Sequence, residues 1–182
     1  RIGAIHSVVF GGFASNELAS RIDDSKAKLL VTASCGFEPG RTVEYKPLVD
    51  EAIKIANHKI EKMILFQRTG HEVKLNAPKE ISWQEAISNA KDVDCVEINS
   101  NEFAYILYTS GTTGTPKGIV RDIGGHIVAL KWTMKNIYNI DADDIWWSAS
   151  DIGWIVGHSY IVYAPLFKGC TTVLFEGKPV GT

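Results

Sequence analysis

Hydrophobic and polar positions change along the chain in short blocks that predict strands and helices in turn. Apolar runs rich in β-branched and aromatic residues predict strands, and they lie at 5–10, 29–33, 63–67, 103–108, 145–150 and 171–175. Apolar residues at helical spacing predict helices at 16–26, 47–57, 83–90 and 125–138. The stretches 34–43 and 68–82 carry neither pattern, so we expect loops there.

Polar residues at the predicted helix starts support this division. Ser15 and Ser82 stand where N-caps are expected, and Pro47 falls in the first helical turn, where proline is tolerated. Strands that alternate with helices of this length predict β-α-β units. The expected fold class is therefore α/β, with largely parallel sheets flanked by helices. Ligands of such sheets bind at the carboxyl ends of the strands.

The character of the sequence changes abruptly after the strand at 103–108, where the small-residue loop T-S-G-T-T-G-T-P-K begins. Gly111 and Gly114 permit close approach of the backbone to a ligand, and the hydroxyls donate hydrogen bonds without adding negative charge. Lys117 supplies a positive charge, and each charge-assisted hydrogen bond is worth roughly 1.5–3 kcal/mol. We therefore predict a phosphate-binding loop formed by Thr109, Ser110, Gly111, Thr112, Thr113, Gly114 and Lys117.

The spacing of this loop, G-x-x-G-x-P-K-G, differs from that of a Walker A motif. The proline and glycine on either side of Lys117 disfavour a helix that starts at the lysine. The alternative interpretation is a flexible polar hairpin between two strands.

Composition limits the partners of the protein. Of 182 residues 45% are hydrophobic, and 19 basic residues face 21 acidic ones. This balance predicts a globular protein that binds neither nucleic acid nor membranes, since no apolar run approaches the roughly 20 residues that span a bilayer. Three cysteines far apart in the sequence predict no disulfide framework, and no metal site is expected. A reducing compartment, the cytoplasm or the mitochondrial matrix, fits this composition.

Four motifs carry a resemblance to a known family. The loop TSGTTGTPKG resembles the signature of the adenylate-forming enzymes, which include acyl-CoA synthetases, peptide-synthetase adenylation domains and luciferases. The stretch DIGWIVGHSYIVYAPLFKGCTTVLFEG at 151–177 is similar to short-chain acyl-CoA synthetases, most of all to the propionyl-CoA synthetases. SVVFGGF and EPGRTVEYKPLVDEA extend the resemblance over essentially the whole chain. It implies that 1–182 is part of the large amino-terminal domain of the adenylate-forming (AMP-binding) fold, incomplete at both ends.

The resemblance implies an acid-thiol ligase that uses ATP, Mg²⁺ and coenzyme A. Such an enzyme converts a short-chain carboxylate, propionate or acetate, through an acyl-adenylate to an acyl-CoA thioester and releases AMP and pyrophosphate. The family's adenine, magnesium and catalytic-lysine elements are expected beyond residue 182, so residues 1–182 alone are expected to be inactive and no catalytic residue is assigned here. Two alternatives remain, a carrier-linked adenylation module of a peptide synthetase and a non-catalytic nucleotide-binding fragment.

The resemblance also implies an acyl pocket. Trp154 matches the aromatic position beside the acyl group, and Ile155 and Val156 match the lining of the alkyl pocket. Acetyl-CoA synthetases usually carry threonine where Val156 stands, and the more apolar valine favours propionate. One methylene is worth only about 1–3 kcal/mol of discrimination. The alternative for Trp154 is simple core packing.

Coenzyme A is expected, again by resemblance, at Phe10, Gly12 and Arg41. Glu38 stands where the family often has a second arginine, and the alternative for Arg41 is an ordinary surface arginine. His158 is interpreted as structural, because a carboxylate is already ionised at neutral pH and needs no base. The family often places His and Thr shortly after the glycine loop, where Arg121 and Asp122 stand here, and their role is open.

Overall fold

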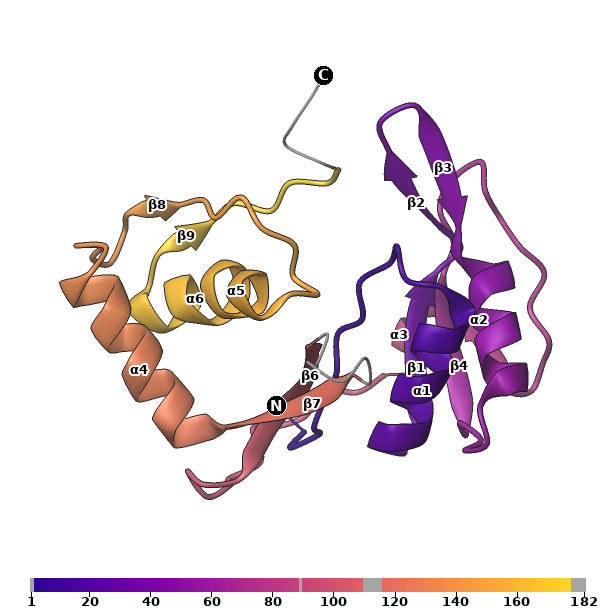
Figure 1. Cartoon of the computed structure of the whole chain (residues 1–182), viewed down its shortest axis with the longest axis horizontal. Coiled ribbons are helices and arrows are strands. Elements are labelled where there is room, and N and C mark those ends of the chain that lie inside the picture. The colour runs from indigo at the N-terminus through magenta and orange to yellow at the C-terminus, as the bar shows by residue number, and fades with distance from the viewer. Residues whose placement is uncertain (1, 89, 110–115, 178–182) are drawn as a thin grey trace. The chain divides into compact units, whose positions relative to one another are not determined.

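The computed structural model describes residues 2–88, 90–109 and 116–177, which form two compact units (Figure 1). Among the described residues, unit 1 comprises 2–10 and 93–177, and unit 2 comprises 11–92. No helix within the described ranges is long and apolar enough to cross a membrane.

Unit 2 is built on a parallel three-stranded sheet. Its strands lie in the order β1 (Leu29–Ala33), β4 (Lys62–Phe66) and β5 (Glu80–Ser82). The helices are α1 (Ser15–Ser25), α2 (Tyr45–Ile55) and α3 (Trp83–Ser88). A short antiparallel hairpin of β2 (Cys35–Glu38) and β3 (Arg41–Glu44) leads into α2.

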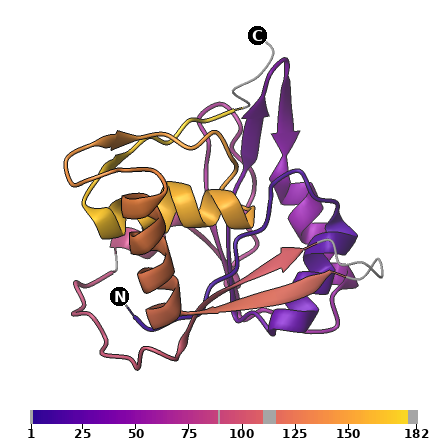
Figure 2. The same cartoon turned by 60° about the vertical axis from the view of Figure 1, so that its left-hand side comes forward.

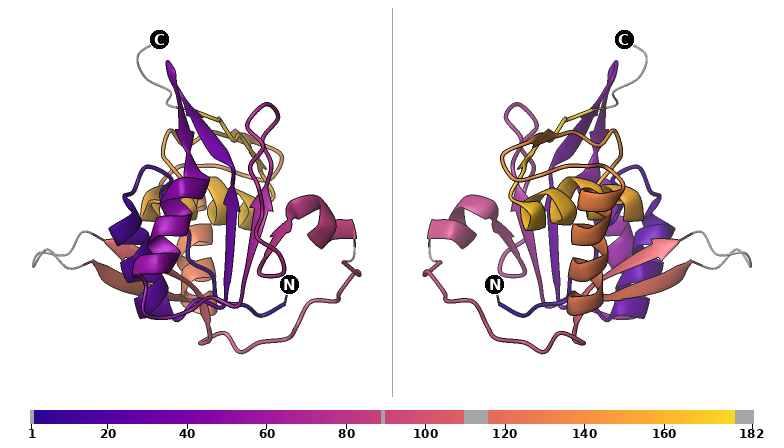
Figure 3. Two further views of the ribbon diagram at one scale, coloured as in Figure 1. Left: turned by 90° about the vertical axis from the view of Figure 1, so that its right-hand side faces the viewer. Right: turned by 90° about the vertical axis from the view of Figure 1, so that its left-hand side faces the viewer.

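The sheet of unit 2 has helices on both faces (Figure 3). Met63 and Leu65 lie two positions apart in β4, so both point to the face that α1 and α2 cover. On the opposite face the ring of Trp83 in α3 packs edge-on against Phe66, with ring centroids 6.5 Å apart. The apolar residues of α1 and α2 thus pack against β4 in the main core of unit 2. This core consists of Ala19, Ile22, Val49, Ala52, Ala56, Ile60, Met63 and Leu65.

The first two strands of unit 1 form an antiparallel pair. The strand β6 (Phe103–Thr109) pairs with β7 (Lys117–Asp122), which continues directly into α4 (Ile123–Asn136) (Figure 2). The carboxylate of Asp122 accepts a hydrogen bond of 2.7 Å from the Gly125 N–H, so Asp122 is the N-cap of α4. This contact gives Asp122 a structural role.

The rest of unit 1 is a helical layer beside a second, two-stranded parallel sheet. The strands are β8 (Ile145–Trp146) and β9 (Thr171–Thr172). Between them the chain runs through α5 (Ile155–Gly157), the π-helical segment η1 (His158–Tyr163) and α6 (Ala164–Lys168). These helices pack on α4 around a buried core of Leu130, Met134, Ala164 and Cys170.

The predicted α/β class with parallel strands flanked by helices is confirmed, and local differences have physical causes. The strand predicted at 5–10 is reduced to one bridge between His6 and Tyr105. The hairpin β2–β3 covers 35–44 and so occupies most of the stretch 34–43 that was expected to be a loop, because its polar residues hide the strand pattern. Ser15 was wrong as a cap, since α1 begins at Ser15 and Ala14 takes the extended N-cap conformation without a side-chain hydrogen bond. Ser82 was right, because its hydroxyl accepts from the Glu85 N–H at 3.0 Å.

Candidate functional site

The predicted phosphate loop connects the paired ends of β6 and β7. Thr109 lies directly opposite Lys117 in the antiparallel register, whereas residues 110–115 lie outside the described part of the chain. Lys117 begins a strand and not a helix, as its flanking proline and glycine predicted. The hairpin and phosphate-loop interpretations are therefore compatible, because pairing of the strands holds both ends of the donor-rich loop together.

Lys117 has the charge and exposure that a phosphate ligand requires. Its side chain belongs to an exposed residue, and no ion-pair partner of Lys117 occurs in the ranges 2–88, 90–109 and 116–177. Thr109 is half-buried beside it. The two described ends of the loop thus fit a polyanion, with one ammonium group that no carboxylate of the described chain neutralises.

The predicted acyl segment is a tight turn that leads into α5. The Asp151 carboxylate accepts from the Gly153 N–H at 2.7 Å, and its backbone carbonyl accepts from the Trp154 N–H at 3.0 Å. Gly157 lies directly against the Asp151 carbonyl, where a Cβ atom would overlap with the oxygen. The turn therefore requires glycine at 157, and it fixes the start of the helix that carries Ile155 and Val156.

Trp154 and Val156 offer apolar surface at this turn. Trp154 is the N-cap of α5 and is 43% exposed, Val156 is 54% exposed, and Ile155 is half-buried. Ile155 and Val156 follow each other in the helix and point about 100° apart, whereas Trp154 precedes the first helical turn in an extended conformation. The ring of Phe10 lies 6.0 Å from that of Trp154, which places one predicted coenzyme A residue beside the predicted acyl residues in unit 1.

The other two predicted coenzyme A residues, Gly12 and Arg41, lie in unit 2. Tyr45 packs against both segments that carry these residues. A Cβ atom added to Gly11 or to Gly36 would overlap with the Tyr45 hydroxyl. These glycines thus allow the turn at 11–12 and the hairpin β2–β3 to approach one tyrosine. At the hairpin end, Arg41 Nη2 lies 2.7 Å from a carboxylate oxygen of Glu38, so the positive charge of Arg41 is partly offset.

A cluster of histidine and tyrosine side chains lies in unit 1 and was not predicted from the sequence. His158 is buried, and its Nδ1 lies 3.2 Å from the carbonyl oxygen of Ile152. Its Nε2 lies 2.9 Å from Nε2 of His6. Beside this pair the hydroxyl of Tyr105 lies 3.1 Å from Nε2 of His126. No spacing in the sequence could reveal a contact between residues 152 positions apart.

Burial controls the ionisation of this cluster. Removal from water, with a smaller contribution from His6, lowers the pKa of His158 to about 4. Burial also lowers the pKa of His6 and of His126 and raises the pKa of Tyr105. The imidazoles are therefore neutral at pH 7. A histidine with so low a pKa is a poor general base, in keeping with the structural interpretation of His158.

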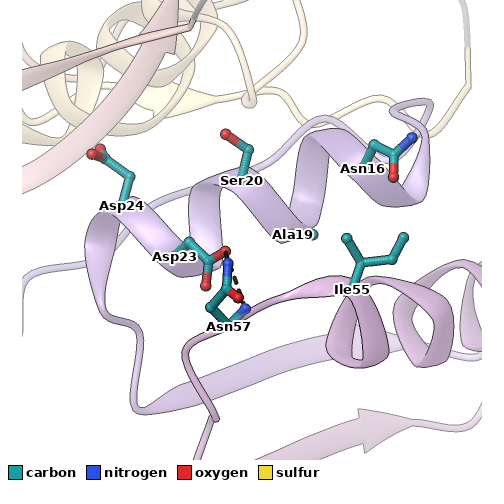
Figure 4. A pocket seen from close by; sticks show the side chains of 7 residues that line it. All are labelled: Asn16, Ala19, Ser20, Asp23, Asp24, Ile55 and Asn57. Carbon is teal, nitrogen blue, oxygen red and sulfur yellow. Dashed lines mark hydrogen bonds between the residues drawn. The ribbon is translucent and has the colours of Figure 1, made fainter.

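Two surface cavities of unit 2 are not lined by any predicted site residue. One, of about 530 Å³, lies between α1 and the end of α2 (Figure 4). Its Asp23 carboxylate accepts from the backbone N–H groups of His58 and Asn57 at 2.6 and 3.1 Å, which lowers the pKa of Asp23 and joins α1 to the bend that follows α2. The other, of about 550 Å³, contains buried Lys46, which is paired with Asp50 at 2.6 Å. The carboxylates of Asp23 and Asp50 thus both have structural partners.

Comparison with known proteins gives a family match over residues 1–182 to the model described as AMP-binding enzyme. The chain is 57% identical over 183 residues to human mitochondrial acyl-CoA synthetase short-chain family member 3, covering 100% of this chain and 27% of that protein. It is 46% identical over 181 residues to acetyl-coenzyme A synthetase of Photobacterium profundum, covering 98% of this chain and 28% of that protein. The chain thus spans somewhat more than a quarter of the length of these relatives.

Proposed function

The chain belongs to the AMP-binding enzyme family, and on that premise we propose that the full-length protein is an ATP-dependent short-chain acyl-CoA synthetase. Its preferred substrate is propionate, with acetate as a second substrate. In the first step a carboxylate oxygen attacks the α-phosphorus of ATP, and pyrophosphate leaves. In the second step the thiol of coenzyme A loses its proton and attacks the acyl carbonyl, and AMP leaves.

The observation that carries this proposal is the loop TSGTTGTPKG between Thr109 and Lys117, the two residues that pair at the ends of β6 and β7. The barrier to adenylation is mainly electrostatic, because an anionic carboxylate must approach a polyanion. Hydroxyls, glycine N–H groups and one ammonium group within nine consecutive residues supply donors without negative charge. The chain therefore neutralises and orients the phosphates while the carboxylate attacks.

The acyl group is proposed to lie against Trp154 and Val156. Both side chains are exposed at the turn that Asp151 and Gly157 define, and their apolar surface suits an alkyl chain of two or three carbons. Valine at 156 offers no hydrogen bond, which favours the more apolar substrate.

Two further ligands belong to the proposal. Mg²⁺ neutralises phosphate charge when it is bound, and since no cluster of three metal-ligating side chains occurs among the described residues, we propose that it enters with the phosphates of ATP. Coenzyme A is proposed to contact Phe10, Gly12 and Arg41. The relevant compartment is a reducing one, and the mitochondrial matrix is favoured because the similar human protein is named mitochondrial.

Product analysis of the full-length protein tests this function. With propionate, ATP, Mg²⁺ and coenzyme A, we expect propionyl-CoA, AMP and pyrophosphate in equal amounts, and less product with acetate. Formation of ADP and phosphate would contradict adenylate chemistry. Transfer of the acyl group to a carrier-bound pantetheine, with none to free coenzyme A, would favour the peptide-synthetase alternative, against which the stretch GWIVGHSY and the Arg41 loop speak.

A further inference from the structure

Three groups in unit 1 form a line of hydrogen bonds whose direction the chemistry determines. A carbonyl oxygen only accepts, so the contact of 3.2 Å between His158 Nδ1 and the Ile152 oxygen requires a proton on Nδ1. Since His158 is neutral, its Nε2 then carries a lone pair. The partner at 2.9 Å, Nε2 of His6, must therefore donate its proton to His158.

This line connects two parts of the candidate site. At one end, Ile152 lies in the turn that positions Trp154. At the other end, the backbone of His6 is bound to β6, because the Ile106 N–H donates to the His6 carbonyl at 2.9 Å. β6 is the strand that leads into the glycine loop. The imidazole pair therefore joins the acyl segment to the strand that carries the phosphate loop.

The surroundings of His158 hold its ring in one orientation. The ring of Tyr105 packs edge-on against it with centroids 4.6 Å apart, and the ring of Tyr163 does so at 5.4 Å. The π-helical segment η1 begins at His158 itself. Such segments are rare and occur frequently at functional sites, which is a second reason to look for a role beyond core packing.

We infer that His6 and His158 are positioning residues, which hold the Ile152 carbonyl and thereby set the turn that presents Trp154 and Val156 to the carboxylate. This inference rests on the proposed function. It assigns to the pair no contact with the reacting atoms. Its consequence is specific: loss of the hydrogen bond should weaken productive binding of the carboxylate and should leave ATP binding unchanged.

Substitutions at His6 in the full-length protein separate positioning from general stability. His6→Leu removes the donor, whereas the amide nitrogen of glutamine lies near the position of Nε2, so His6→Gln retains a donor. We expect His6→Leu to raise the KM for propionate about 5- to 30-fold with the KM for ATP within about twofold. His6→Gln should restore most of the loss.

His126→Gln is the matched control, since His126 belongs to the same cluster but contacts Tyr105 and not the turn. It should lower the thermal midpoint and leave the KM for propionate unchanged. An unchanged KM for propionate in folded His6→Leu, or an equal rise in His126→Gln, would overturn the inference. If His6→Leu does not fold, His6→Gln tests the inference instead. A rise of about 5- to 30-fold in its KM for propionate would show that the hydrogen-bond donor is not responsible and would overturn the inference.

A measurement without substrate keeps this inference distinct from the proposed function. In the full-length protein with ¹⁵N-labelled histidine, NMR should show His158 as the Nδ1–H tautomer and His6 as the Nε2–H tautomer at pH 7. The opposite tautomer at His158 would overturn the positioning line even in an active enzyme. A wild-type protein that activates no carboxylate but shows the expected tautomers would instead contradict the proposed function.

Discussion

Glu38 and Arg41 close the end of the β2–β3 hairpin as an ion pair in which Nη2 and Nε of the arginine lie 2.7 and 2.8 Å from one carboxylate oxygen. The glutamate is the less exposed partner, with 19% of its side chain accessible against 68% for the arginine. A phosphate that approaches Arg41 therefore meets a guanidinium group that already has a carboxylate partner. If coenzyme A binds here, Glu38 weakens the contact.

Glu38→Gln should lower the KM for coenzyme A about 2- to 5-fold at low ionic strength, since exposed ion pairs are worth about 0.2–1 kcal/mol. The gain should shrink at high salt. It should be absent with dephospho-coenzyme A if the 3′-phosphate is the group that Arg41 contacts.

Glu44→Gln is the control for this substitution, because it removes the same charge from the base of the same hairpin, opposite Cys35. Steady-state kinetics with coenzyme A as the varied substrate supply the numbers. An equal effect of both substitutions would remove Arg41 from the coenzyme A site.

The substrate preference depends on Val156. Val156→Thr keeps nearly the same volume but places a hydroxyl against the terminal carbon of propionate, and an unpaired hydroxyl costs on the order of 1–3 kcal/mol. The ratio of kcat/KM for propionate over acetate should therefore fall roughly 3- to 30-fold. Val128→Thr, at an exposed valine on α4, should leave the ratio unchanged. A constant ratio in Val156→Thr would exclude this residue from the acyl pocket.

The low pKa of His158 predicts how stability depends on pH. Because the folded-state pKa is about 4 against an ordinary value of 6.5, the unfolded chain binds the proton first as the pH falls. The stabilisation is complete well above pH 6.5 and is lost between pH 6.5 and 4, on the order of 3 kcal/mol in all. Burial lowers the pKa of His6 and His126 as well, which adds to the loss.

Thermal unfolding of the full-length protein between pH 7.5 and 5 measures this effect. His158→Asn retains a donor near Nδ1 but does not titrate, so its midpoint should fall less steeply with pH than that of the wild type. His71→Asn, at a histidine of unit 2 outside the cluster, should follow the wild type. Parallel pH profiles for all three proteins would contradict the proposed ionisation of His158.

The sequence predicted the elements whose residues form a clear local pattern. The apolar periodicity located α1, α2 and β4 to within two residues, since each has a buried face that must repeat with the element. The glycine loop was found because its glycines, hydroxyls and lysine serve no common structural purpose together. The roles of 110–115 and of the predicted ligand residues stay predictions.

What the sequence could not predict depends on contacts between distant segments. The strand β7 was not predicted because apolar and polar residues do not alternate along it. Its strand conformation depends on pairing with β6. The line from His6 to Ile152 requires the N-terminal segment to lie beside η1. Neither contact leaves a local pattern in the residues that make it.

The central claim is that the loop between Thr109 and Lys117 supports formation of an acyl-adenylate, and pyrophosphate exchange tests it most directly. The full-length protein should exchange labelled pyrophosphate into ATP when propionate is present and coenzyme A is absent. Lys117→Ala should reduce the exchange rate by at least about 10-fold, because it removes a charge-assisted phosphate contact. Gly114→Val, within the loop, should do the same, whereas Lys131→Ala, at an exposed lysine of α4, should not. Exchange at the wild-type rate in both loop variants would contradict the account.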